Sequence, residues 1–227
     1  MHAKNKFGFG ATVVFALHPT RLTAEHFRDV FVEGFEDFQY LDTTREQPSR
    51  HQILLEHGIT VADYRPNPKD VREGLSVRLH LLSPGERDFG IGFPGEYRFL
   101  MAALPADEEY LDYEGKWFRM FLERAFKAFD ILQPSFGWGD DFDYLLKFRR
   151  KDPRRQAFAL NLYGAEAVAE IGRDRLRSAP SWKVMERPWG GTIVQLAEKP
   201  FHPIRTIPDD KREALRKHLR LEEINWE

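Results

Sequence analysis

Alternation of apolar and polar positions predicts strands in the first half of the chain. Residues 7–17 are rich in aromatic and β-branched side chains and are followed by a His-Pro pair, which is typical of a strand and its end. Residues 75–82 alternate leucine or valine with polar side chains, as a half-buried strand does, and residues 97–104 predict another strand. Residues 41–67 contain proline and glycine at irregular intervals, which favours loop over most of this stretch.

Two stripes of phenylalanine predict the main helices. The first stripe follows Thr23, which can cap a helix, and its members recur every three or four positions: Phe27, Val30, Phe31, Phe35 and Phe38. The second stripe follows a run of carboxylates, which favour the positive end of a helix dipole, and it ends before Pro134. It comprises Phe118, Phe121, Leu122, Ala125, Phe126 and Phe129. Both faces are expected to be core.

Shorter elements follow in the last third of the chain. Residues 157–163 form an apolar run suited to a buried strand, and residues 164–171 suit a short helix that ends at a glycine. Residues 182–186 and 192–196 flank a Pro-Trp-Gly-Gly turn, which predicts a hairpin. Residues 209–219 predict a polar helix near the end of the chain.

These elements predict an α+β fold in which an antiparallel or mixed sheet packs against two main helices. A chain of 227 residues lies near the upper end of ordinary single domains, so we expect one domain over residues 1–227. Two closely packed parts, a looser N-terminal half at 1–105 and a C-terminal half at 106–227, are also compatible with this length.

Composition narrows the range of functions. Charges nearly balance, with a formal net charge of −2, so no global field attracts nucleic acid or an anionic membrane. The chain contains no cysteine, which excludes disulfides, thiolate metal sites and cysteine nucleophiles and suits a reducing compartment. The apolar run at residues 12–17 is too short for a secretion signal or a membrane span. We therefore expect a cytoplasmic protein with no membrane partner.

Two motif-like patterns have simpler explanations. Gly90, Gly92 and Gly95 match the spacing of a dinucleotide-binding loop, but Pro94 intervenes and the sequence that follows predicts a strand instead of the required helix. The closest pair of histidines is six residues apart, whereas helical zinc-binding pairs need a spacing of three or four. We expect no cofactor.

Asp140, Asp141 and Asp143 are the best candidates for catalysis. They follow a Gly-Trp-Gly sequence, and three carboxylates on a flexible turn could hold Mg²⁺ for a metal-dependent enzyme. They lack the spacing, the central glycine and the distal glutamate of a calcium loop, and no histidine nearby offers a general base. We expect these residues to cap and charge the start of the segment 142–148, with a metal-dependent enzyme as the alternative.

A cluster of six cations between residues 147 and 155 could bind phosphates or an acidic protein face. A solvated loop is the ordinary explanation, because the chain as a whole is slightly acidic. Nucleic-acid binding is not expected, since no recognised nucleic-acid-binding motif accompanies the cluster.

The last third of the chain also carries an ordered set of residues that matches a known pattern. The set consists of Phe136, Gly137 and Trp138; Asn161, Leu162, Tyr163 and Gly164; Ile171, Gly172 and Arg173; Ala179, Pro180 and Trp182; and Gly190 and Gly191. It resembles bacterial immunity proteins that are encoded beside secreted toxins. The resemblance implies a small α+β protein that binds and blocks a cognate toxin, often one delivered by type VI secretion, without catalysing a reaction.

An immunity function would require an interface with a few aromatic or arginine anchors inside a polar rim. Trp138 and Trp189 both lie in Gly-rich stretches, where large side chains can be presented to a partner, although either could instead plug the end of the sheet. Arg150 and Arg154 lie in the cationic cluster. These four residues are the candidate partner-binding residues.

Overall fold

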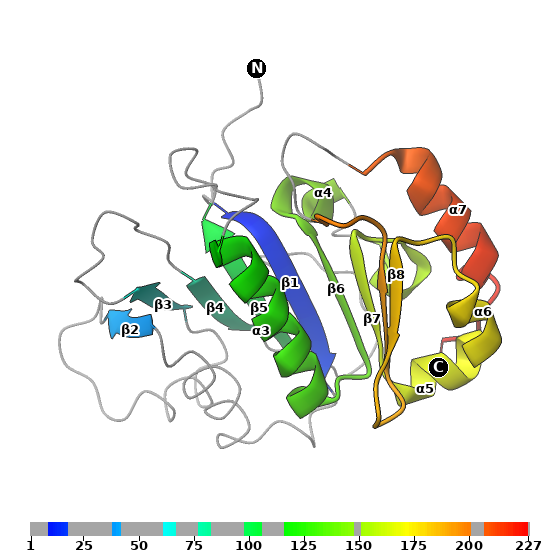
Figure 1. Ribbon diagram of the computed structural model, residues 1–227, viewed down its shortest axis with the longest axis horizontal. Helices are drawn as coiled ribbons and strands as arrows, with labels where there is room; N and C mark the ends of the chain where they lie inside the picture. Colours follow the sequence, from blue (N-terminus) through cyan, green and yellow to red (C-terminus); the bar gives the residue numbers. More distant parts are fainter. Residues whose placement is uncertain are drawn as a thin grey trace.

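The computed structural model describes residues 9–17, 38–41, 61–66, 77–82, 98–105, 116–147, 151–200 and 207–226. Nine strands within these ranges form one sheet, in the order β2-β3-β4-β5-β1-β6-β7-β9-β8 (Figure 1). Each neighbouring pair is antiparallel. The α+β fold is therefore confirmed, and the sheet is antiparallel.

The first half of the chain supplies one side of this sheet. Its strands are β1 (Phe9–Leu17), β2 (Phe38–Leu41), β3 (Val61–Pro66), β4 (Val77–Leu82) and β5 (Arg98–Pro105). The predicted strands at 7–17, 75–82 and 97–104 are confirmed. Because β1 lies between β5 and β6, the two halves of the chain share one continuous sheet.

The expectations for residues 23–67 need correction. Phe38 opens β2 instead of ending a helical stripe, and β3 lies within the stretch expected to be mostly loop. Residues 61–66 contain few strong strand formers, so pairing with β4 outweighs their weak local preference. The rest of the helix predicted after Thr23 lies outside the described residues.

The second half supplies the remaining strands and the described helices. The strands are β6 (Phe136–Asp141), β7 (Leu160–Tyr163), β8 (Lys183–Glu186) and β9 (Thr192–Gln195). The helices are α3 (Lys116–Leu132), α4 (Phe142–Lys147), α5 (Ala165–Ile171), α6 (Arg173–Arg177) and α7 (Asp209–Leu219), with a 3₁₀ turn at Pro153–Arg155. The predicted helices at 118–129, 164–171 and 209–219 and the hairpin formed by β8 and β9 are confirmed.

Strand β6 was expected to be a Gly-rich turn. It lies between β1 and β7, close to the middle of the sheet. A Cβ atom at Gly137 would come within 2.9 Å of the Val14 carbonyl oxygen and 3.0 Å of Leu162 Cδ1. Glycine therefore permits close packing inside this strand, and it does not mark a turn here.

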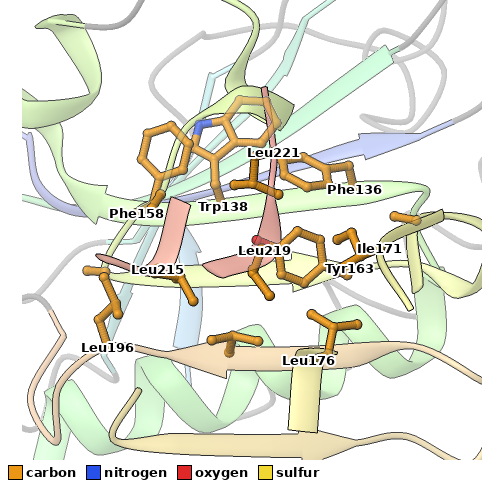
Figure 2. Packing of buried hydrophobic residues seen from close by; sticks show 14 of the residues in the cluster. Phe136, Trp138, Phe158, Tyr163, Ile171, Leu176, Leu196, Leu215, Leu219 and Leu221 are labelled. Carbon is orange, nitrogen blue, oxygen red and sulfur yellow. The ribbon is translucent and has the colours of Figure 1, made fainter. Parts of the chain in front are cut away.

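Helices cover both faces of this half of the sheet. On one face, α5, α6 and α7 contribute Val168, Leu176 and Leu215 to a cluster with side chains from β1, β6, β7 and β9 (Figure 2). Alternate strand residues point to the other face. Helix α3 crosses β1 (Figure 1), and its Phe129 is fully buried. Among the described helices, none is long and apolar enough to cross a membrane.

Candidate functional site

Asp140 is the carboxylate that the sequence placed at the centre of a possible metal site. It lies near the end of β6 and is 2% exposed. Arg212, in the first turns of α7, reaches it with both terminal nitrogens, and Arg212 Nη2 lies 3.1 Å from Asp140 Oδ1. The backbone N–H of Ala159 donates to Oδ2 at 2.8 Å, and that of Asp141 donates to Oδ1 at 2.9 Å. Both oxygens of Asp140 are therefore already bound by the protein itself.

Tyr144 from α4 completes this cluster. The Arg212 guanidinium carbon lies 3.7 Å from the centre of the Tyr144 ring, which is a cation–π arrangement. Burial raises the pKa of Asp140 above its ordinary value, although the charge and hydrogen bonds of Arg212 oppose the rise. Burial also raises the pKa of Tyr144 to about 12. Asp140, Tyr144 and Arg212 come from β6, α4 and α7, respectively. The cluster therefore holds these three elements together inside the protein.

Asp141 and Asp143 are the other two aspartates of the candidate metal site. Asp141 is partly exposed, and the side chain of Asp143 lies outside the described residues. Within the described part of the chain, no three histidine, aspartate or glutamate side chains are grouped so that they could hold a metal ion. Helix α4 begins directly after Asp141. The carboxylate of Asp140 bonds Asp141, Ala159 and Arg212, which lie outside α4, so capping by Asp141 or Asp143 stays a prediction.

Trp138 lies inside the protein. It is 3% exposed, and its ring centre is 6.0 Å from that of Phe158 and 5.8 Å from that of Phe136. The ring belongs to the cluster shown in Figure 2, to which α7 contributes Leu215 and Leu219. Of the two alternatives for Trp138, presentation at the surface on a turn is wrong and burial is confirmed, although the ring lies in a core strand with neighbours on both sides and not at the end of the sheet.

Trp189 lies in the turn between β8 and β9 and is half-buried. Its Nε1 donates to Asp130 Oδ1 at 3.1 Å, and its ring centre is 4.8 Å from that of Phe129. A Cβ atom at Gly191 would come within 2.3 Å of the Trp189 ring, so the glycine makes room for the indole. Trp189 thus fastens the hairpin to α3, and its role toward a partner stays a prediction.

Arg154 is also held inside the protein. It is 6% exposed, and its Nη2 lies 3.0 Å from Asp152 Oδ2 while Nε lies 3.1 Å from Oδ1. Its guanidinium carbon is 5.7 Å from the centre of the Trp226 ring, so it helps to seat the C-terminal segment. The expectation of an exposed cation is wrong at this position, and Arg150 lies outside the described residues.

Residues that carry the family resemblance hold the fold together. The Asn161 side chain accepts from the Phe158 N–H at 2.9 Å and donates to the Phe158 carbonyl oxygen at 2.8 Å. A Cβ atom at Gly164 would come within 2.2 Å of a backbone oxygen in the segment between α3 and β6. Gly172 and Gly190 have φ values of 95° and 99°, which side chains disfavour. These members of the set support the scaffold, whereas Arg173 and Trp182 of the same set are exposed.

Trp182 is the exposed aromatic that the sequence analysis did not select as an anchor. It directly precedes β8, the last strand in the sheet order, and is 51% exposed. The local sequence could not distinguish it from Trp138, because exposure depends on which strand forms the edge of the sheet. The useful signal is the lysine beside it in a short strand, since charged residues are typical of sheet edges.

Comparisons with known proteins support the fold. No protein-family model matches the chain, and no curated protein matches it in sequence. Among solved structures, the Pseudomonas aeruginosa T6SS protein PA0821 is similar, with a TM-score of 0.51 and 12% sequence identity. The similarity covers 94% of this chain and 76% of the other. At this identity, the two chains share a fold.

Proposed function

We propose that this chain is a non-catalytic immunity protein that binds and neutralises a cognate protein toxin associated with type VI secretion. The observation that carries the proposal is the likeness in fold to a T6SS protein over 94% of the chain. The proposal includes action in the cytoplasm, because a chain without cysteine suits a reducing compartment.

The resemblance to immunity proteins supports the same proposal from separate residues. Asn161, Gly164 and Gly172 match the family pattern and occupy positions where the fold needs them. The likeness in fold and the likeness in residues are two separate supports for the proposal. On such a scaffold, the exposed side chains decide which toxin is bound, because hot spots of an interface are exposed in the free protein and buried in the complex.

The partly exposed Trp189 remains a candidate for the toxin interface, as does Arg150. Trp138 and Arg154 are buried, so in this proposal they shape the interface only through the core. An interface of ordinary size buries about 800 Å² on each partner, which leaves room for anchors on several elements.

Growth of bacteria that express the product of the gene adjacent to this one tests the proposal. We expect that product to be toxic when it is directed to its compartment of action, and growth to be restored when this chain is co-expressed. Co-expression of an unrelated cysteine-free protein of similar size serves as the control. Toxicity that persists at full expression of this chain would contradict the proposed function.

A further inference from the structure

One exposed region combines an aromatic side chain with excess positive charge. Among the described large hydrophobic side chains, only Ile131 and Trp182 are exposed, at 38% and 51%. Trp182 directly precedes β8 and Lys183 opens it, and α6 lies beside this strand, since Arg177 on α6 bonds Glu186 on β8. We call Trp182, Lys183, Arg177, Glu186 and Arg173 the Trp182 surface.

Trp182 is held in place before any partner arrives. Its backbone N–H donates to the Gln195 carbonyl oxygen at 2.9 Å, which fixes it to β9. Lys183 Nζ lies 5.8 Å from the centre of the Trp182 ring. Within the described part of the chain, the indole N–H has no hydrogen-bond acceptor. The backbone that carries the indole is therefore fixed before binding, so less conformational entropy is lost when a partner binds it.

The charge around Trp182 is positive. Residues 173–187 contain five arginine or lysine side chains and two carboxylates, although the whole chain carries a formal net charge of −2. Arg187 pairs with Asp130 on α3, which leaves four cations and the two carboxylates. Arg177 Nη2 lies 3.1 Å from Glu186 Oε2, so one carboxylate is already neutralised. That hydrogen bond lowers the pKa of Glu186, and the charge of Arg173 acts in the same direction. Arg173 itself forms no ion pair with the described residues, so its charge is available to a partner.

The backbone of β8 is poorly suited to accept another strand. The strand has four residues, and Lys183 and Glu186 place charges at its two ends. Short length and terminal charges are features that protect sheet edges from strand addition. This surface therefore offers its side chains to a partner.

From these observations we infer that the Trp182 surface binds an acidic face of a folded protein partner, with the Trp182 indole entering an apolar pocket. The inference rests on the proposed function, because the partner is then the toxin. Lys183 beside Trp182, and Arg173 near the Arg177–Glu186 pair, would contact carboxylates around that pocket. Electrostatic attraction of this kind raises the association rate and makes binding weaken with salt.

The test measures binding of purified variants to the product of the adjacent gene by surface plasmon resonance. Truncating a central anchor costs at least 2 kcal/mol, so Trp182→Ala should weaken binding about thirtyfold or more. Lys183→Glu should mainly slow association and reduce its dependence on NaCl concentration. Ile131→Ala and Lys127→Glu are matched controls, because both exposed residues lie on α3, outside the Trp182 surface, and each should change the affinity less than twofold.

The possible results distinguish failure of the Trp182 surface from failure of the proposed function. Loss of binding in Trp182→Ala and Lys183→Glu, with both controls unchanged and all variants folded by circular dichroism, supports the inference. If the wild-type chain binds and Trp182→Ala binds equally well, the surface is wrong while the proposed function stands. If the wild-type chain does not bind, the proposed function fails. Affinity of the wild type that does not fall with NaCl, or tighter binding to a short double-stranded DNA than to the protein, overturns the acidic protein as the occupant.

Discussion

Replacing Arg212 with methionine tests whether the Asp140 cluster is structural. The substitution keeps an apolar chain of similar length but removes the guanidinium that binds both carboxylate oxygens of Asp140. The carboxylate is 2% exposed and would be left buried without a counter-charge. Breaking a buried ion pair from one side costs about 3–5 kcal/mol. Since domains are typically stable by about 5–15 kcal/mol, we expect Arg212→Met to lose a large part of the free energy of unfolding.

Arg216 provides a matched control on the same helix, about one turn further along. Its Nη1 lies 2.8 Å from Glu222 Oε1, but its side chain is 31% exposed. Ion pairs that are open to solvent contribute about 0–1 kcal/mol, so Arg216→Met should cost no more than that. Urea unfolding followed by tryptophan fluorescence gives both values, provided that the dependence on urea concentration has the same slope in each variant.

A double substitution separates the ion pair from simple loss of packing. Asp140→Asn together with Arg212→Met removes both charges, and it should cost less than the sum of the two single changes because neither charge is then left alone. The structural explanation would be refuted if Arg212→Met unfolded at the same urea concentration as Arg216→Met. It would also be refuted if Asp140→Asn stabilised the protein and abolished saturable Mg²⁺ binding in calorimetry, because the carboxylate would then be a ligand.

Three further predictions concern the core and the effect of pH. Trp138→Ala should cost about 3–5 kcal/mol of stability in urea unfolding, because it leaves a cavity in the cluster of Figure 2, and an unchanged midpoint would show that the ring is not core. Gly164→Ala should destabilise more than a surface Gly→Ala change, since its Cβ would lie 2.2 Å from a backbone oxygen; thermal unfolding that matches the wild type would contradict this. Burial raises the pKa of Tyr144 to about 12, so the stability from its protonated form is complete below pH 10 and is lost as the pH rises toward 12. Wild type should therefore lose more stability over this interval than Tyr144→Phe does, and parallel losses would show that Tyr144 titrates normally.

Local patterns in the sequence were sufficient for elements whose periodicity is regular. The phenylalanine stripe of α3 and the hairpin of β8 and β9 follow from spacing and turn residues alone. The face of α3 was only partly as expected, because Phe129 is fully buried whereas Phe126 is partly exposed. Phe118 and Phe121 belong to the same predicted face, and their side chains lie outside the described residues.

Strand β6 shows what local patterns miss. Phe136, Trp138 and Asp140 recur every second residue, which is a strand signal, but the intervening glycines indicate a turn when they are considered alone. Gly137 is required because Val14 and Leu162 from neighbouring strands approach it closely, and this approach depends on tertiary structure. Once β6 is a central strand, the burial of Trp138 follows.

The environment of the candidate site residues depends even more on residues that are far away in the sequence. Asp140 binds Arg212, which lies 72 residues further along the chain, so the local sequence of the three aspartates could not show that this carboxylate is neutralised. Trp182 is exposed because β8 is the last strand in the sheet. The sequence of the hairpin alone does not show which of its two strands forms the edge. Sequence spacing thus located the aromatic and charged residues, while topology decided which of them a partner could reach.

The central claim is that this chain neutralises a toxin by binding it, without turnover. The most direct measurement is a titration of purified chain against a fixed concentration of the product of the adjacent gene, with the residual toxic activity of that product as the readout. We expect the activity to fall linearly and to reach its minimum at a fixed molar ratio near one, with the complex persisting on size-exclusion chromatography. Full toxin activity at a large excess of this chain, or complete loss of activity at a small fraction of one equivalent, would contradict the claim, because the first result excludes binding and the second requires catalysis.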